Sequence, residues 1–244
     1  MTLKPLWALL VCWSPALAQY NGLPDKETLY YNIEWRLITA GKAKIQWLDV
    51  PNKGWQVNLH LESAGLVSKL YRVDDDYSAN LTQAICAQQV NLSTHEGSRD
   101  RETKIGFDYN SHKADYLERD RAKNAVFLQR ETEIPNCTHE IAGGLYYLRT
   151  LNLEPGQSTQ IAVTDGKKSV MAKVEAQQRE DVKTPEGVFK TIRYEAYLFD
   201  NVLYRRSARL YIWLTDDRRK LPVQIRVRLQ FAIGSITLQL EKHE

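Results

Sequence analysis

Cysteine and histidine are both scarce in this sequence of 244 residues, which contains three cysteines and five histidines. None of the cysteines lies in a C-x-x-C pair, so the spacing that zinc sites and thiol–disulfide sites use is missing. His139-Glu140 is similar to the start of a metalloprotease helix, but Gly143 stands where the second histidine of that motif has to be. The sequence therefore predicts no metal site.

Motifs of nucleotide-binding and nucleophilic enzymes are missing as well. No serine lies in a G-x-S-x-G elbow, and no glycine-rich loop of the phosphate-binding kind occurs. The paired carboxylates of a glycosidase lie on different strands, so a hydrolase of envelope glycans or lipids stays open as the least favoured alternative. We expect a protein that is not an enzyme, with no catalytic residues and no cofactor.

Charge of one sign is not concentrated in any part of the chain. Lysine and arginine number 33 and aspartate and glutamate 30, for a net charge of +3. The two signs are interspersed, which excludes the basic footprint of a nucleic-acid-binding protein. We therefore expect no nucleic-acid partner.

The longest apolar run lies at the amino terminus. Lys4 precedes apolar residues from Leu6 to Trp13, and Ala16-Leu17-Ala18 has the small-x-small form of a cleavage site. Residues 1–18 are predicted to be a secretory signal peptide, and residues 19–244 a single β-barrel-like domain. No later stretch approaches the roughly 20 consecutive apolar residues of a membrane-spanning helix, so no transmembrane span is expected in the mature chain.

Two cysteines remain after removal of the predicted signal peptide. Cys86 and Cys137 are expected to form a disulfide in an oxidising compartment, with two separate buried thiols as the alternative. Closing a loop of about fifty residues would stabilise the folded state by roughly 4 kcal/mol on the chain-entropy account.

Alternation of apolar and polar residues is the dominant pattern of the chain. It is clearest from Val223 to Phe231, where every second residue is apolar, as in a strand with one buried face. The runs Leu210–Leu214 and Ile236–Leu240 continue the pattern, which predicts three consecutive antiparallel strands. The opposite face, which includes Gln224, is expected to be solvated.

Similar runs occur along the rest of the chain. Turn sequences such as Asp165-Gly166 separate them, and Ala40-Gly41 is expected to separate the first two strands. A short helix is expected at Leu66–Tyr71. Counting the runs gives about a dozen strands, so the predicted fold is mainly β, a long antiparallel curved sheet or a partly closed barrel.

One central helix is predicted at about residues 138–150, where apolar residues repeat at helical spacing. Thr138 is expected to cap its first backbone N–H groups. Gly143-Gly144 would cost such a helix about 2 kcal/mol relative to alanines. We therefore expect the helix to lie against the concave side of the sheet, in close approach to another backbone.

Large apolar side chains on the concave side are the candidate binding residues. A curved sheet with a wide aromatic interior can hold an apolar or lipidic ligand, although the same side chains also form packed cores. The expected ligand contacts are Trp35, Trp55, Leu145, Leu148 and Phe231. If the core is packed instead, the alternative is an envelope scaffold or interaction protein that acts through its charged outer strands.

Several arginines follow the same late strands. They form either a patch for anionic lipid or cell-wall polymer, or an ordinary solvated strand surface. The residues concerned are Arg205, Arg206, Arg209, Arg226 and Arg228.

An ordered set of segments resembles a known family. It comprises Gly144–Gly156, Thr184–Phe189, Ile212–Asp217, Leu221–Val223 and Ile233–Ile236, with Tyr31–Trp35 and Ala40–Ala43 near the start. Together they resemble the bacterial envelope family called domain of unknown function 3108. The resemblance implies an exported, periplasmic protein with no established activity and no catalytic residues to carry over. It also implies a curved sheet like those of lipoprotein carriers and lipocalins. As partner we expect a lipid or another apolar ligand, or else an envelope protein.

Overall fold

A computed structural model of the chain describes residues 22–36, 38–229 and 234–244, which form one fourteen-stranded antiparallel sheet and two helices. The strands are β1 (Lys26–Trp35), β2 (Ile38–Val50), β3 (Gly54–Ser63), β4 (Asp74–Leu81), β5 (Ala87–Glu96), β6 (Arg99–Asp108), β7 (Lys113–Asp120), β8 (Ala125–Glu133), β9 (Ser158–Thr164), β10 (Ser169–Thr184), β11 (Gly187–Ala196), β12 (Ala208–Thr215), β13 (Pro222–Leu229) and β14 (Ser235–His243). The helices are α1 (Gly65–Leu70) and α2 (Ile141–Thr150). The signal peptide predicted for residues 1–18 lies outside the described residues. Among the described residues, no helix has the length and apolar character that crossing a bilayer requires.

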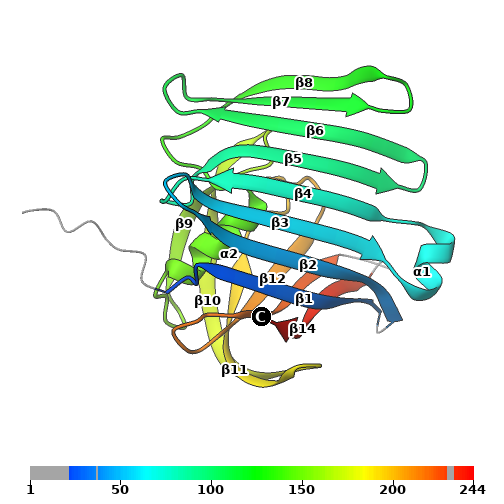
Figure 1. Ribbon diagram of the computed structural model, residues 1–244. Helices are drawn as coiled ribbons and strands as arrows, with labels where there is room; N and C mark the ends of the chain where they lie inside the picture. The colour runs from blue at the N-terminus through cyan, green and yellow to red at the C-terminus, as the bar shows by residue number, and fades with distance from the viewer. Residues whose placement is uncertain (1–21, 37, 230–233) are drawn as a thin grey trace, which may run out of the picture.

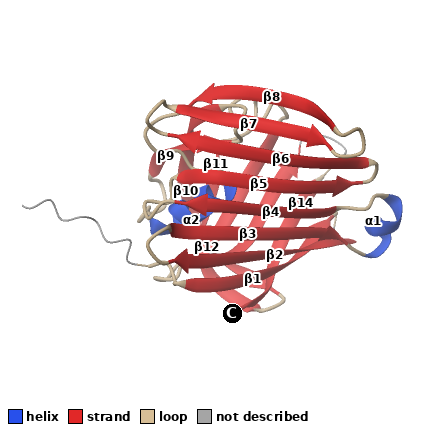
Figure 2. Ribbon diagram, turned by 45° about the horizontal axis from the view of Figure 1, so that its top comes forward, coloured by secondary structure: helices blue, strands red, loops and turns tan. Residues whose placement is uncertain are grey.

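The strands follow one another across the sheet with a single rearrangement. The order runs from β8 back to β1, crosses to β14 and continues backward to β9. Figure 1 shows β1–β8 as one broad face, and Figure 2 shows the later strands behind it with α2 between the two halves. The sheet curves without closing, which confirms the predicted mainly β architecture.

Cross-strand rows of apolar residues give the sheet its buried face. In β2 the alternate residues Ala43, Ile45 and Trp47 are buried, while the polar residues between them are partly exposed. Ile45 lies opposite Leu59 of β3, and Leu59 lies opposite Tyr77 of β4. The alternation in the sequence therefore directs one continuous apolar surface toward the concave side.

The predicted junction at Ala40-Gly41 is wrong, because both residues lie inside β2. Opposite Gly41, the register of β1 shifts between Ile33 and Glu34. A Cβ atom on Gly41 would lie 2.3 Å from the carbonyl oxygen of Glu62 in β3. This glycine therefore marks a close approach of two backbones rather than a turn.

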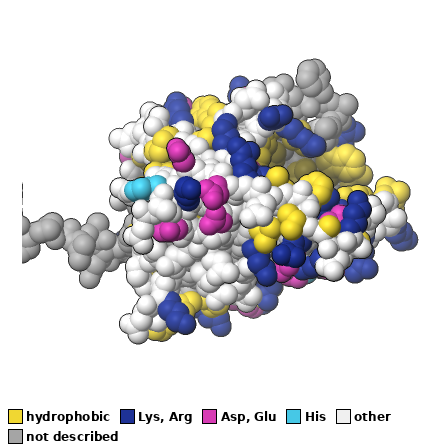
Figure 3. Space-filling model, turned by 90° about the horizontal axis from the view of Figure 1, so that it is seen from above, with side chains coloured by type: hydrophobic (Ala, Val, Ile, Leu, Met, Phe, Trp, Pro, Cys, Tyr) yellow, Lys and Arg dark blue, Asp and Glu magenta, His cyan; other side chains and the backbone are white. Residues whose placement is uncertain are grey.

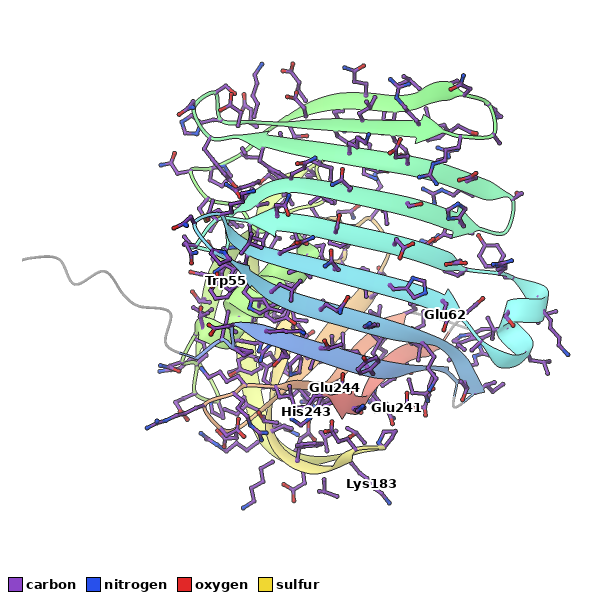
Figure 4. All side chains as sticks on the ribbon, viewed as in Figure 1. Trp55, Glu62, Lys183, Glu241, His243 and Glu244 are labelled. Carbon is purple, nitrogen blue, oxygen red and sulfur yellow. A yellow bond between two sulfur atoms is a disulfide. The ribbon has the colours of Figure 1, made fainter. Side chains whose placement is uncertain are left out.

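The outer face of the late strands is partly covered, which corrects the expectation of a solvated surface there. Gln224 and Trp213 are both buried, and the Trp213 indole Nε1 donates a hydrogen bond of 2.8 Å to Glu180 Oε1 in β10. At the β10–β11 turn, Glu186 contacts His243, whose place at the end of β14 is labelled in Figure 4. The β10–β11 hairpin thus bends across the outside of β12–β14.

Cys86 and Cys137 form the expected disulfide, with Cα atoms 5.1 Å apart. The backbone N–H of Ala87 donates to the carbonyl oxygen of Thr138 beside it, at 2.8 Å. The disulfide therefore ties the start of β5 to the segment that leads into α2.

Candidate functional site

Helix α2 packs on the concave side of the sheet, as predicted. The expected close approach to another backbone at Gly143-Gly144 is wrong, because the atoms nearest to a Cβ atom on either glycine belong to side chains. The ring of Tyr146 stacks on Trp47, with centroids 4.1 Å apart, and Trp47 stacks in turn on Trp55 at 4.8 Å. Trp55 lies at one end of β3 and Glu62 near the other, as Figure 4 shows. The aromatic stack therefore holds α2 near the Trp55 end of the strands.

The start of α2 is capped by Glu140, and the predicted cap at Thr138 is wrong. The Glu140 carboxylate accepts hydrogen bonds from the backbone N–H groups of Ala142 and Gly143 and from the hydroxyl of Tyr77. The buried Thr138 hydroxyl has no hydrogen-bond partner in the described part of the chain. Burial raises the pKa of the Glu140 carboxyl, and the three donors oppose that shift.

A buried ion pair fixes the last turn of α2. The Arg149 guanidinium contacts the Glu27 carboxylate through two hydrogen bonds, of 2.6 Å and 2.9 Å. It donates a third bond, of 3.0 Å, to the carbonyl oxygen of Arg219. Both side chains are almost fully buried, so removing either partner would leave an uncompensated charge.

His139, the first residue of the His139-Glu140 pair that is similar to a metalloprotease helix, joins the start of α2 to the segment that contains Ile85. Its ring stacks on Tyr147 with centroids 4.1 Å apart, and its Nδ1 lies 2.8 Å from the carbonyl oxygen of Ile85. Burial lowers the pKa of this histidine. In the described part of the chain, no group of three or more His, Cys, Asp or Glu side chains could hold a metal ion.

A cavity of about 430 Å³ remains between α2 and the curved sheet. Its walls are Ile45, Leu59, Tyr77, Ile141, Ala142, Gly144, Leu145, Tyr146, Leu148, Ile161, Val163, Ala172, Val174, Ala196, Leu198, Phe199, Tyr204, Leu210, Ile212, Ile225, Val227 and Leu238. None of these described wall residues is charged. Figure 3 shows hydrophobic side chains gathered in a hollow of the surface, with Lys and Arg side chains beside it.

The polar atoms of the cavity wall side chains are tyrosine hydroxyls. Burial and the neighbouring Glu140 raise the pKa of Tyr77 well above its ordinary value, and burial raises the pKa of Tyr204 to about 12. Neither hydroxyl ionises near neutral pH, so neither supplies a base there. The walls instead favour the transfer of an apolar molecule from water, by about 25 cal/mol per Å² of apolar area buried.

The predicted ligand contacts are distributed unevenly around this cavity. Leu145 and Leu148 of α2 line it. Trp55 lies behind Trp47 in the aromatic stack, and Trp35, which is 38% exposed, lies at the far end of β1. Phe231 lies outside the described residues. Contact of these side chains with a ligand stays a prediction.

Most residues of the cavity wall were not identified from the sequence. The later strands contribute Ile161, Val174, Ala196 and Ile212 among others. Alternation marks them as inward-facing, but it does not distinguish a cavity wall from a filled core. That distinction depends on which side chains face them across the interior.

The family of the chain follows from a comparison with protein families. Residues 30–241 match the family described as "Protein of unknown function (DUF3108)". The chain belongs to this family. A search of the curated proteins finds no match.

Three solved structures are similar to the chain at low sequence identity. A beta-barrel-like protein of domain of unknown function DUF1849 from Brucella abortus has a TM-score of 0.58 at 9% identity, covering 90% of this chain and 97% of that chain. A presumed exported protein with a YmcC-like fold from Bacteroides fragilis NCTC 9343 has a TM-score of 0.38 at 11% identity, covering 89% and 95%. A DUF1089 family protein from Pseudomonas aeruginosa has a TM-score of 0.41 at 12% identity, covering 78% and 90%. The first of these supports the curved, barrel-like architecture and nothing about function.

Proposed function

We propose that this chain is a non-catalytic protein of the bacterial periplasm that binds an apolar or lipidic ligand between α2 and the concave face of the sheet. The observation that carries the proposal is the cavity of about 430 Å³ with apolar walls. Ligand pockets typically have volumes of about 300–1,000 Å³ and mostly hydrophobic walls, and this cavity has both properties.

Small wall residues leave the space open. Gly144 of α2 faces the sheet, and Ala172 and Ala196 are buried on the opposite wall. Larger apolar residues at these three positions would fill the interior. A scaffold protein, which is the alternative, would have such a filled core. The cavity therefore favours a ligand-binding protein over a scaffold protein.

The walls favour binding over catalysis. The hydroxyl of Tyr77 donates its hydrogen bond to Glu140, which also caps α2. A carboxylate used in this way supports the fold rather than a reaction. The ligand would be held by hydrophobic burial, with no bond broken.

Two features support export to the periplasm. Residues 1–18 have the pattern of a secretory signal peptide. The disulfide between Cys86 and Cys137 would persist in an oxidising compartment and is rare in a reducing one.

A titration with a fluorescent fatty-acid probe tests the proposal. We expect saturable binding to the wild type and a loss of affinity of at least about tenfold in Gly144→Leu, because the added side chain occupies the cavity. Gly144→Ala is the matched control, since one methyl group leaves most of the space. Absence of saturable binding, or equal affinity in Gly144→Leu, would remove the proposal.

A further inference from the structure

Helix α1 lies with one side against β2 and is exposed on the other. It buries none of its residues, and Leu66 and Leu70 are 68% and 82% exposed. They are four residues apart and therefore lie on the same face of the helix. Tyr71, which follows the helix, is half exposed.

The β1–β2 hairpin adds further apolar side chains beside this helix. Trp35 ends β1 and Ile38, which is 56% exposed, begins β2. The backbone N–H of Ala64 donates to the carbonyl oxygen of Ala40 at 2.9 Å, which joins the start of α1 to β2. Figure 1 shows α1 and the hairpin at the same end of the sheet. The apolar rim, as we name this surface, consists of Trp35, Ile38, Leu66, Leu70 and Tyr71.

The apolar rim carries positive charge. Residues 35–39 and 64–72 contain three basic residues, Arg36, Lys69 and Arg72, and no acidic residue. Arg72 is paired with Asp74 at the start of β4, at 3.2 Å, so its charge is already balanced. The Arg36 guanidinium lies 5.7 Å from the ring centroid of Trp35. Basic residues among exposed aromatic and aliphatic side chains are typical of proteins that lie in a membrane interface.

A second group of arginines lies at the same end of the sheet. Arg209 of β12 and Arg228 of β13 are exposed and directly opposite each other. Arg228 also lies opposite Ser235, whose carbonyl oxygen accepts a hydrogen bond of 3.5 Å from the backbone N–H of Arg36. Arg209 already has a carboxylate partner, since its Nε lies 3.8 Å from Glu195 Oε1. Like charges in opposite positions destabilise a sheet, and an anion bound beside Arg228 would add to the relief that Glu195 provides.

A row of residues that lie opposite one another on neighbouring strands joins the apolar rim to the cavity wall. Trp35 lies opposite Ile236, Ile236 opposite Val227, and Val227 opposite Leu210. Val227 and Leu210 are wall residues of the cavity. Since α2 covers the opposite end of the strands, the cavity extends from the helix toward the apolar rim.

We propose that the apolar rim docks on the surface of a bilayer that contains anionic phospholipid. Leu66, Leu70 and Ile38 enter the interface between headgroups and acyl chains, while the basic side chains contact lipid phosphates. A second copy of the chain is disfavoured as the occupant, because a symmetric contact would bring the same basic residues together. This proposal is independent of ligand binding, although docking would bring the cavity close to lipid.

Flotation with phospholipid vesicles tests this proposal. The full chain is expected to float with vesicles of phosphatidylcholine mixed with phosphatidylglycerol, and only weakly with phosphatidylcholine alone. Leu66→Ser combined with Leu70→Ser is expected to lower the partition coefficient by at least about tenfold, because two exposed leucines no longer leave water. Lys69→Glu combined with Arg228→Glu is expected to weaken binding most at low salt, because screening already weakens it at high salt.

The matched control is Val188→Ser combined with Met171→Ser. These two residues are 66% and 54% exposed, comparable to the rim residues, but lie elsewhere on the sheet. An equal loss in this control would overturn the proposal, as would failure of the wild type to float with anionic vesicles. Concentration-dependent dimerisation that requires Leu66 and Leu70, without flotation, would assign the rim to self-association instead and equally refute the proposal. Gly144→Leu is expected to float normally, which separates this result from ligand binding.

Discussion

The two adjacent glycines of α2 should respond in opposite ways to the same substitution. A Cβ atom on Gly144 would meet Val163 Cγ1 at 3.7 Å and His139 Cβ at 3.8 Å, which are ordinary van der Waals distances. Alanine also has less conformational freedom to lose on folding than glycine. Gly144→Ala is therefore expected to stabilise the protein by about 0.5–1 kcal/mol.

At Gly143 the added methyl group has no room. Its Cβ would lie 2.7 Å from Glu140 Oε1 and 3.3 Å from both methyl groups of Leu81. The Glu140 carboxylate cannot move without breaking the cap, because it accepts hydrogen bonds from α2 and Tyr77. Loss of a helix cap lowers the free energy of unfolding by about 0.5–2 kcal/mol. A buried carboxylate that has lost some of its hydrogen-bond donors lowers it by about 1–3 kcal/mol more. Gly143→Ala should therefore destabilise the protein by about 0.5–4 kcal/mol after the gain of about 1 kcal/mol in helix propensity.

Urea unfolding of both variants at neutral pH measures these differences. The midpoint of unfolding should rise for Gly144→Ala and fall for Gly143→Ala, with the slope of free energy against urea unchanged. If Gly143→Ala is stabilised as much as Gly144→Ala, the cap geometry that we assign to Glu140 is incorrect.

Three further predictions concern the groups around α2. Replacing Arg149 by methionine leaves the buried Glu27 carboxylate unpaired, so the free energy of unfolding measured in urea should fall by about 3–5 kcal/mol. A fall of less than about 1 kcal/mol would contradict the buried ion pair. Burial lowers the pKa of His139 below its ordinary value of 6.5. As the pH drops below this value, the histidine of the unfolded chain is protonated before that of the folded chain, so the stability of the fold should fall. His139→Gln should show a weaker decline of stability between pH values of about 7 and 5, and an unchanged decline would show that other groups cause it. Replacing both Cys86 and Cys137 by serine should lower stability by about 2–5 kcal/mol, and reducing agent should then leave the double variant unchanged while it destabilises the wild type.

Alternation and cysteine count predicted much of the fold. The strands could be identified because buried and partly exposed residues alternate in segments such as β2, and the disulfide because Cys86 and Cys137 are the two cysteines left after the predicted signal peptide. The position of α2 on the concave side was predicted as well, although the close backbone approach at Gly143-Gly144 from which it was argued is not found. These properties depend on local sequence or on a very small number of partners.

Properties that depend on distant partners could not be predicted. Thr138 and Glu140 can both cap a helix, but the carbonyl of Thr138 is held by Ala87 beside the disulfide, and the helix begins only after Glu140. Gln224 has the sequence position of a solvated residue and is buried because the β10–β11 hairpin bends across the outside of the sheet. The cavity has the same origin, because the space beside Gly144 depends on residues more than one strand away.

Native mass spectrometry of the mature protein, purified without detergent and then exposed to a bacterial lipid extract, tests the central claim most directly. We expect a bound apolar molecule on the wild type and on Gly144→Ala, and loss of that species on Gly144→Leu. A wild type that carries and takes up no lipid, or a Gly144→Leu variant that takes up as much as the wild type, would contradict the account.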